Sequence, residues 1–418
     1  MLRNKRGARY DARPTATTCA PSTSTPSASC SQRSVRAPDC CIYSVLMTAY
    51  LMSYHAAGRT WLDSDGLHLA QSADGLGWEP LHGPSRCETA YPAQGFGSGL
   101  FLAPTVGRCR FLENARAFAP ASERGRRAWA PFKAVLENST HCTGGRLLRD
   151  PFLMWHPPTS RYHALWTTGW ASPTIGHASS SDLIEWSAQR EIELPFASSV
   201  TQQVINAWAP EAYYDRKSQR TIIFWSTAHG IPWTKPVDIK RSFFTVYYSI
   251  TTDWVRFTDA KPLLPANSPS IIDATMAPYS AAEGGYFLVY KHEVNKTLAT
   301  AASKTLEGPY LEVAVDIAPG SSAEGPTVIR KSKEEVIIYF DRYEAGKYGA
   351  VSASRMRGPW TDISDSLTVP AGARHATVFR MPKAQVHRLR ALYGPRERGM
   401  WRPEGATIGV SERERLVG

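Results

Sequence analysis

Five short segments of this 418-residue chain begin with a charged residue just ahead of a strand-like run. By difference of residue numbers, these five residues are 61, 62, 51 and 51 positions apart. Repeats of roughly 40–50 residues are typical of β-propeller blades, and a propeller brings the first strand of every blade to one axis. Four carboxylates and a histidine are therefore expected to meet in one pocket. The five residues are Asp150, Glu211, Asp273, Glu324 and His375.

Carboxylates at such an axis would be partly withdrawn from water and close to one another. Both effects raise the pKa of at least one of them. One protonated carboxyl beside an ionised one is what glycosidic bond hydrolysis requires. A single acidic residue at a strand start more often caps a turn in water, so the inference depends on the recurrence. It also depends on apolar flanks such as Phe152 after Asp150 and Ile272 before Asp273.

The elements that would position these residues recur with them. Each copy holds the charged start, three β-rich stretches and a turn that ends near an aromatic residue, which favours four antiparallel strands per blade. The pattern is clearest in four alternating runs, each of which is expected to form one strand, at residues 162–167, 221–226, 286–291 and 336–341.

The fifth copy is split between the two ends of the chain. Residues 374–382 supply its start and first strand, and residues 48–78 supply the remaining hairpin and turn. We predict an all-β, five-bladed β-propeller whose ring is closed by the N-terminal hairpin pairing with the C-terminal strand, which removes exposed edges. The predicted domain covers residues 44–385, with an irregular insertion at about 97–141, a disordered segment at 1–43 and a flexible basic tail at 386–418.

Composition narrows the possible partners. The net charge is +11, but much of it lies outside the repeats and no nucleic-acid motif accompanies it, so we expect no nucleic-acid partner. None of the seven cysteines follows Cys142 and no CxxC pattern occurs, which argues against zinc and against a disulfide-built fold. The sequence contains no 18-residue apolar run of the kind that spans a membrane, and no clear secretory signal is visible. The compartment is left open, and a monomer is expected.

Four motifs follow one another along the chain at these strand starts. They read Arg149-Asp150-Pro151, Trp208-Ala209-Pro210-Glu211, Ile272-Asp273-Ala274-Thr275 and Glu324-Gly325-Pro326. In this order they resemble glycoside hydrolase family 43. The resemblance covers about residues 48–385 without 97–141. It implies a five-bladed propeller of the arabinofuranosidase, arabinanase and xylosidase group, which inverts the anomeric centre. Carried over by motif, Asp150 would be the base, Glu324 the acid and Asp273 the modulator of that acid.

Two departures from the pattern stand beside this resemblance. Glu211 lies where many relatives have Asp, and Arg-Asp-Pro also resembles the invertase and levansucrase families, in which that Asp stabilises the transition state. Those families need an earlier Asn-Asp-Pro motif, which this chain lacks.

Six further residues are candidates for contact with a sugar. Trp170 and Trp208 follow strand ends and are expected to stack on a sugar ring, with packing inside a blade as the alternative. Lys291 and Arg342 follow inner strands and are expected to bind hydroxyl groups. The resemblance implies no required cofactor, although a histidine near the axis, here His375, can hold a structural calcium ion. Glu211 is the sixth candidate for contact with a sugar.

The function we predict is hydrolysis of pentose-containing polysaccharides or oligosaccharides, with arabinose or xylose as the sugar and α-L-arabinofuranose first. A propeller that binds carbohydrate without cleaving it is the alternative. A protein-scaffold propeller is a third hypothesis, and it leaves the charged starts unexplained.

Overall fold

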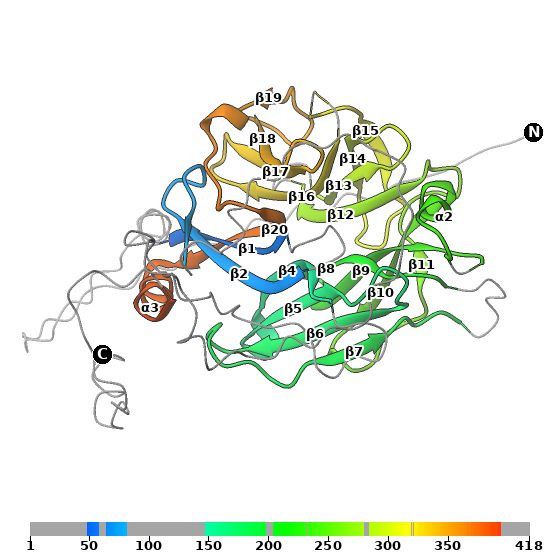
Figure 1. Cartoon of the computed structure of the whole chain (residues 1–418), viewed down its shortest axis with the longest axis horizontal. Coiled ribbons are helices and arrows are strands. Elements are labelled where there is room, and N and C mark those ends of the chain that lie inside the picture. The colour runs from blue at the N-terminus through cyan, green and yellow to red at the C-terminus, as the bar shows by residue number, and fades with distance from the viewer. Residues whose placement is uncertain are drawn as a thin grey trace, which may run out of the picture. The chain divides into compact units, whose positions relative to one another are not determined.

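The computed structural model describes residues 48–57, 64–81, 147–197, 204–231, 233–279, 284–318, 320 and 322–393. Within these residues the chain forms five four-stranded antiparallel sheets, which are the blades of a propeller (Figure 1). The prediction of an all-β, five-bladed β-propeller is confirmed. The segment 1–43, the insertion 97–141 and the end of the basic tail lie outside the described residues.

Four blades are built from consecutive strands. The first holds β4 (Arg149–His156), β5 (Arg161–Thr167), β6 (Thr174–Ser180) and β7 (Arg190–Glu193). The second holds β8 (Trp208–Asp215), β9 (Arg220–Ala228), β10 (Phe244–Thr251) and β11 (Lys261–Pro262). The third holds β12 (Ile271–Pro278), β13 (Tyr286–His292), β14 (Thr297–Ser303) and β15 (Leu311–Ala314). The fourth holds β16 (Ala323–Arg330), β17 (Val336–Arg342), β18 (Lys347–Ala353) and β19 (Thr361–Asp362).

The fifth blade takes strands from both ends of the described chain. Its order is β20-β1-β2-β3, with β20 (Ala373–Pro382), β1 (Thr48–Ala57), β2 (Ser64–Ser72) and β3 (Glu79–Pro80). The first strands of the five blades contact one another in the cyclic order β4, β8, β12, β16, β20 and back to β4. These five strands therefore surround one axis.

Aromatic side chains fill the spaces between blades. Near the end of each of β5, β9, β13 and β17, a large aromatic ring lies fully buried among apolar residues of two adjacent blades. Burying so much apolar area at these four interfaces orders the blades against one another. The four rings belong to Trp166, Trp225, Tyr290 and Phe340.

Among the described residues, four short helices join or follow the strands: η1 (Pro157–Thr159), α2 (Pro236–Arg241), η2 (Ser364–Ser366) and α3 (Lys383–Tyr393). Helix α3 lies beside β20 and β1 (Figure 1). It corrects the predicted boundary at residue 385, because Val386 and Leu389 are buried in the apolar cluster that contains Leu148 and Met381. Their i, i+3 spacing among basic residues hid this apolar face in a segment we interpreted as a flexible tail. No helix of the described residues is long and apolar enough to cross a membrane.

A chain of hydrogen bonds runs through buried histidines beside the first two blades. Arg190 Nε donates to His177 Nδ1 at 3.0 Å, so His177 must donate from Nε2 to His163 Nδ1 at 2.9 Å. His163 then donates from Nε2 to Thr159 Oγ1 at 2.9 Å. The Trp254 ring stacks on His163 with centroids 4.0 Å apart. Because an arginine cannot accept a hydrogen bond, the direction of the chain is fixed at its start.

The same direction continues to a third histidine. Thr159 Oγ1 lies 2.9 Å from His156 Nδ1, and His156 Nε2 lies 3.1 Å from Thr221 Oγ1. The indole of Trp254 donates from Nε1 to His156 Nδ1 at 3.4 Å, so each of the three rings is a neutral imidazole with its proton on Nε2. Burial, with smaller contributions from nearby positive charges such as those of Arg161 and Arg190, lowers the pKa of His163 to about 3. Burial likewise lowers the pKa of His177 far below its usual range.

Candidate active site

The first strand of every blade is interrupted at the same place. A register shift follows its pairing with the second strand, and one residue inside each bulge has a positive φ. Left-handed backbone costs a non-glycine residue roughly 1–2 kcal/mol, so its recurrence marks a conformation that the fold maintains. Bulges next to active sites re-aim side chains. The five residues are Asp150 (49°), Ala209 (45°), Asp273 (55°), Gly325 (54°) and His375 (42°).

This register corrects the sequence interpretation of the five charged starts as equivalent positions. Asp150, Asp273 and His375 are equivalent, but Glu324 lies one residue before its bulge residue, Gly325. Glu211 lies two residues after Ala209 and is paired with Phe224 beyond the bulge. The extra residue of a bulge is invisible to a count of sequence spacing, which is why the five residues looked alike.

One cavity, of about 80 Å³, lies where the inner strands begin. Asp150, Asp273 and Glu324 all line it, so the three predicted catalytic residues are brought together. Glu211 and Lys291 do not line it. The remaining lining residues are Leu147, Arg149, Thr167, Trp170, Trp208, Ile272 and His375.

Asp150 is held at the cavity by three side chains. Thr167 Oγ1 donates to Asp150 Oδ2 at 2.7 Å, and His375 Nδ1 lies 3.3 Å from Asp150 Oδ1. The backbone N–H of Asp150 donates to His55 Nδ1 at 3.3 Å. Burial, with the charge of Arg149 beside it, lowers the pKa of His55 far below its usual range, so His55 is a neutral acceptor. Both oxygens of Asp150 thus have a fixed partner.

Asp273 is almost fully buried, with 6% of its surface exposed. Its Oδ2 accepts the backbone N–H of Gly325 at 3.1 Å. Burial raises the pKa of Asp273 to about 6, against the opposing charge of His375, and the nearby charge of Glu324 adds to the rise. Burial also raises the pKa of Glu211 well above its usual range, and Asp273 raises it further. Burial and the charge of Asp273 thus both favour the neutral form of Glu211.

Glu324 has the opposite electrostatics. Its Oε2 accepts a hydrogen bond from Lys291 Nζ at 2.8 Å. Burial alone would raise the pKa of Glu324, but the ammonium of Lys291, together with the charges of His375 and Arg374, more than offsets burial and lowers it. Lys291 is itself only 3% exposed and lies 3.2 Å from Glu293 Oε2. In the free protein, Glu324 is therefore an ion-paired carboxylate.

The chemistry of the cavity is supported by a ring of five residues, of which sequence reasoning found only Lys291, as a candidate for binding sugar hydroxyl groups. At the end of each second strand, opposite the residue before the bulge, one side chain reaches to the next blade. In four blades it accepts the backbone N–H of the next bulge residue. We call these five residues the second-strand ring: Thr167, Ser226, Lys291, Asp341 and His55. Their shared place at the end of each alternating run was a usable signal.

Asp341 is the one acid of this ring, and it is buried. Arg374 Nε lies 2.8 Å from its Oδ2, and the backbone N–H of His375 also donates to it. Burial raises the pKa of Asp341 to about 7, although the charge of Arg374 opposes this. The pair links β17 to β20 directly behind Glu324.

Residues 127–387, more than half of the chain, match the family-43-related glycosyl hydrolase model described as "Probable glycosyl hydrolase domain". The chain belongs to the family-43-related glycosyl hydrolases. Over 242 residues it is 25% identical to an alpha-L-arabinofuranosidase of Bifidobacterium longum subsp. longum, a match that covers 49% of this chain and 22% of that protein. The chain therefore spans less than a quarter of that relative's length.

Solved structures match the chain at low identity and with TM-scores below 0.5. A thermostable family-43 glycoside hydrolase is 16% identical with a TM-score of 0.42, over 56% of this chain and 80% of that one. An endo-arabinase from Bacteroides thetaiotaomicron is 20% identical with a TM-score of 0.39, over 53% and 81%. A family-43 β-1,3-galactosidase bound to galactodeoxynojirimycin is 14% identical with a TM-score of 0.41, over 52% and 75%. These likenesses do not determine the substrate.

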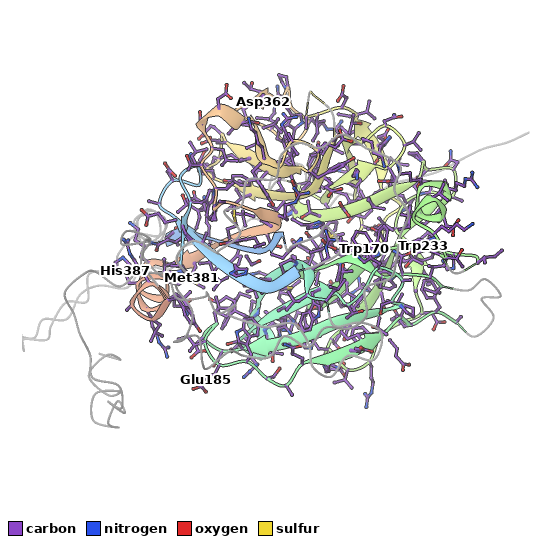
Figure 2. The ribbon with its side chains drawn as sticks, in the orientation of Figure 1. Trp170, Glu185, Trp233, Asp362, Met381 and His387 are labelled. Carbon is purple, nitrogen blue, oxygen red and sulfur yellow. The ribbon has the colours of Figure 1, made fainter. Side chains whose placement is uncertain are left out.

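Two tryptophans form one wall of the cavity in this family-43-related protein. Trp208 Nε1 donates to the backbone oxygen of Trp170 at 2.8 Å, and their rings meet edge to face at 5.5 Å. The Arg149 guanidinium lies 4.7 Å from the centre of the Trp170 ring. Trp233 tilts against Trp208, and Figure 2 labels Trp170 and Trp233 on the same side of the molecule. Trp208 therefore lines the cavity and also packs against neighbouring aromatic rings.

Arg342 lies away from the cavity. It ends β17 and pairs with Asp362 Oδ2 at 3.0 Å on the outermost strand of its blade, at the edge of the molecule in Figure 2. The sequence placed it near Lys291 because both follow inner strands. The strand register separates them. Lys291 pairs with Ile272, the residue directly before the bulge, whereas Arg342 pairs with Ala323, which lies one residue farther from its bulge.

The cavity does not fit the calcium ion that the family resemblance allowed. Among the described residues, no group of three or more His, Cys, Asp or Glu side chains could hold a metal ion. Calcium takes six to eight oxygen ligands. Here His375 directs a ring nitrogen at Asp150, and the oxygens of Asp150 already face Thr167 and His375. No step of the chemistry below passes through a metal.

Proposed function

We propose that this protein is an inverting glycoside hydrolase that releases a pentose, α-L-arabinofuranose first, from an arabinose- or xylose-containing saccharide. The observation that carries the proposal is the single cavity lined by Asp150, Asp273 and Glu324. Three carboxyl groups with different surroundings support a division of roles between base and acid. Monomeric action on a carbohydrate substrate belongs to the same proposal.

Asp150 is the base in this scheme. Its carboxylate is oriented by Thr167 and faces His375, so a water molecule in the cavity would meet an acceptor of fixed geometry. Removing a proton from that water as it attacks the anomeric carbon requires an ionised group at this place. Inversion requires the acid to act from the opposite side of the sugar, with room for the water between the two carboxyl groups.

Glu324 is the acid, and Asp273 sets its protonation. Because burial and the charge of Glu324 raise the pKa of Asp273 to about 6, the two neighbouring carboxyl groups hold a proton between them up to about pH 6. Glu324 would receive this proton when a glycosidic oxygen occupies the cavity. It would then donate the proton to the leaving oxygen.

One observation favours the second candidate, a propeller that binds carbohydrate without cleaving it. In the free protein, Lys291 keeps Glu324 ionised, which is the wrong state for a general acid. The tryptophan wall would serve binding equally well.

A screen of chromogenic arabinofuranosides, xylosides and galactosides tests both candidates. Hydrolysis by the parent protein, and its loss by at least about 10²-fold in Glu324→Gln and in Asp150→Asn, supports the first candidate. Calorimetric binding of arabino-oligosaccharides without product release supports the second. A Glu324→Gln protein that cleaves as fast as the parent would show that the acid is wrongly assigned.

A further inference from the structure

Lys291 departs from the other members of the second-strand ring. Thr167, Ser226, Asp341 and His55 each accept a backbone N–H from the next blade. A lysine ammonium has no lone pair and cannot accept one. The corresponding N–H of Gly325 is taken by Asp273 Oδ2 instead, and Lys291 turns its ammonium to the Glu324 carboxylate.

The ammonium is also shared with a second acid. Its distances are 2.8 Å to Glu324 Oε2 and 3.2 Å to Glu293 Oε2, and the Tyr343 ring centre lies 4.6 Å away. Glu293 in turn pairs with Lys296. A buried ammonium is costly without an anionic partner. With two acids in reach, Lys291 can leave one of them and remain paired.

We propose that Lys291 is a positioning residue whose ammonium, shared between Glu324 and Glu293, controls when Glu324 takes up the proton that it donates. The role of that proton rests on the proposed function. With the ammonium on Glu324, the carboxylate is held ionised and in place. With the ammonium on Glu293, Glu324 is free to accept a proton from the carboxyl cluster.

The sign of the effect follows from the charges around Glu324. Removing the Lys291 cation removes the closest positive charge that opposes the effect of burial, and an opposite charge at this distance is typically worth 1–3 pKa units. Removing the Glu293 anion acts the other way, because of these two acids only Glu324 is then left to pair with Lys291, and a nearby negative charge is lost. The other charged or titratable groups that face Glu324 are Asp273, Asp341, Tyr343, Tyr348, Arg374 and His375.

Two variants of residues that do not line the cavity test this directly. The full chain, labelled with ¹³C at the glutamate carboxyl carbon, is titrated by NMR as the parent, Lys291→Met and Glu293→Gln, with Glu324→Gln used to assign the resonance. We expect the Glu324 midpoint to rise by about 1–3 pH units in Lys291→Met and to fall in Glu293→Gln. Arg342→Met, which removes a cation bound to Asp362 on the same face of the neighbouring blade, is the control and should leave the midpoint unchanged.

The pH dependence of kcat/KM provides the second readout. Its basic limb, which reports loss of the acid's proton, should move with the NMR midpoint in both variants. An unmoved midpoint in Lys291→Met, or shifts of the same sign in the two variants, would overturn the proposal. If Lys291→Met does not fold, Glu293→Gln alone decides, because a purely structural pair predicts no fall. If no glycoside is cleaved, the proposed function fails while the NMR midpoints still decide whether Lys291 controls Glu324.

Discussion

Acid should weaken this protein through the histidine chain, and His163 is the place to measure it. The ring of His163 is 4% exposed, stacks on Trp254, and uses both nitrogens in hydrogen bonds of 2.9 Å. Protonation would put a second N–H on Nδ1, facing the N–H of His177. The folded state therefore excludes the proton that an unfolded histidine accepts.

The magnitude follows from the two pKa values. An unfolded histidine titrates near 6.5, and burial lowers the pKa of His163 to about 3 in the folded protein. A lowered pKa in the folded state means that the unfolded state binds more protons below about pH 6.5, so the free energy of unfolding falls as the pH falls through this range. Each pH unit costs about 1.4 kcal/mol, which gives about 2 kcal/mol at pH 5.

Buried carboxyl groups act in the other direction. Burial raises the pKa of Glu211 and Asp341 in the folded state, so their protonation stabilises the fold as the pH falls. The total pH dependence is therefore a sum of opposing contributions. A difference between the parent and one histidine variant isolates the contribution of His163.

The assay is urea unfolding of the parent and His163→Gln between pH 7.5 and 5.0. The variant should be less stable at pH 7.5, because it loses packing against Trp254. The gap between the two free energies of unfolding should then narrow by about 2 kcal/mol by pH 5.0, since only the parent has to keep a proton out at this position. A gap that stays constant over this range would refute the reasoning.

Three further substitutions have defined outcomes. Thr167→Val removes the donor to Asp150 Oδ2, and the loss of an oriented base should lower kcat/KM about tenfold, or about 1.4 kcal/mol, in steady-state assays; an unchanged rate would count against the role of Thr167. Gly325→Ala adds a methyl group 2.9 Å from the His375 ring at a φ of 54°, so thermal unfolding should show a loss of about 1–3 kcal/mol, and an unchanged melting temperature would contradict this. Glu211→Gln keeps the side chain in the neutral form that burial favours. Because the raised pKa of Glu211 lowers the free energy of unfolding of the parent as the pH rises above about 4.5, the stability of the variant relative to the parent should increase between pH 4.5 and 8. A decrease in that relative stability over the same range would contradict a neutral Glu211.

The sequence predicted the blades because their second strands are alternating runs bounded by turns. Trp166, Trp225 and Tyr290 lie in such runs, and all three are buried between blades as that pattern requires. The motif resemblance then indicated which carboxyl groups meet, and Asp150 and Asp273 do line one cavity. Both successes depend on local patterns that repeat.

What the sequence could not predict depends on contacts between blades. A bulge changes which side chain faces the axis without changing the composition of the segment, so Glu211 could not be distinguished from Asp273 by spacing. The partner of Lys291 is set by the register of β13 against β12 and by the next blade. Arg342, with a similar sequence context, is directed to Asp362 instead.

The anomer of the sugar first released tests the central claim most directly. The parent protein is mixed with the most reactive glycoside from the screen, and the product is followed by proton NMR before mutarotation. An inverting pair of Asp150 and Glu324 predicts that the first product has the anomeric configuration opposite to that of the substrate, and that Glu324→Gln releases at least about 10²-fold less of it. A first product with the substrate's own configuration, or equal release by Glu324→Gln, would contradict the account.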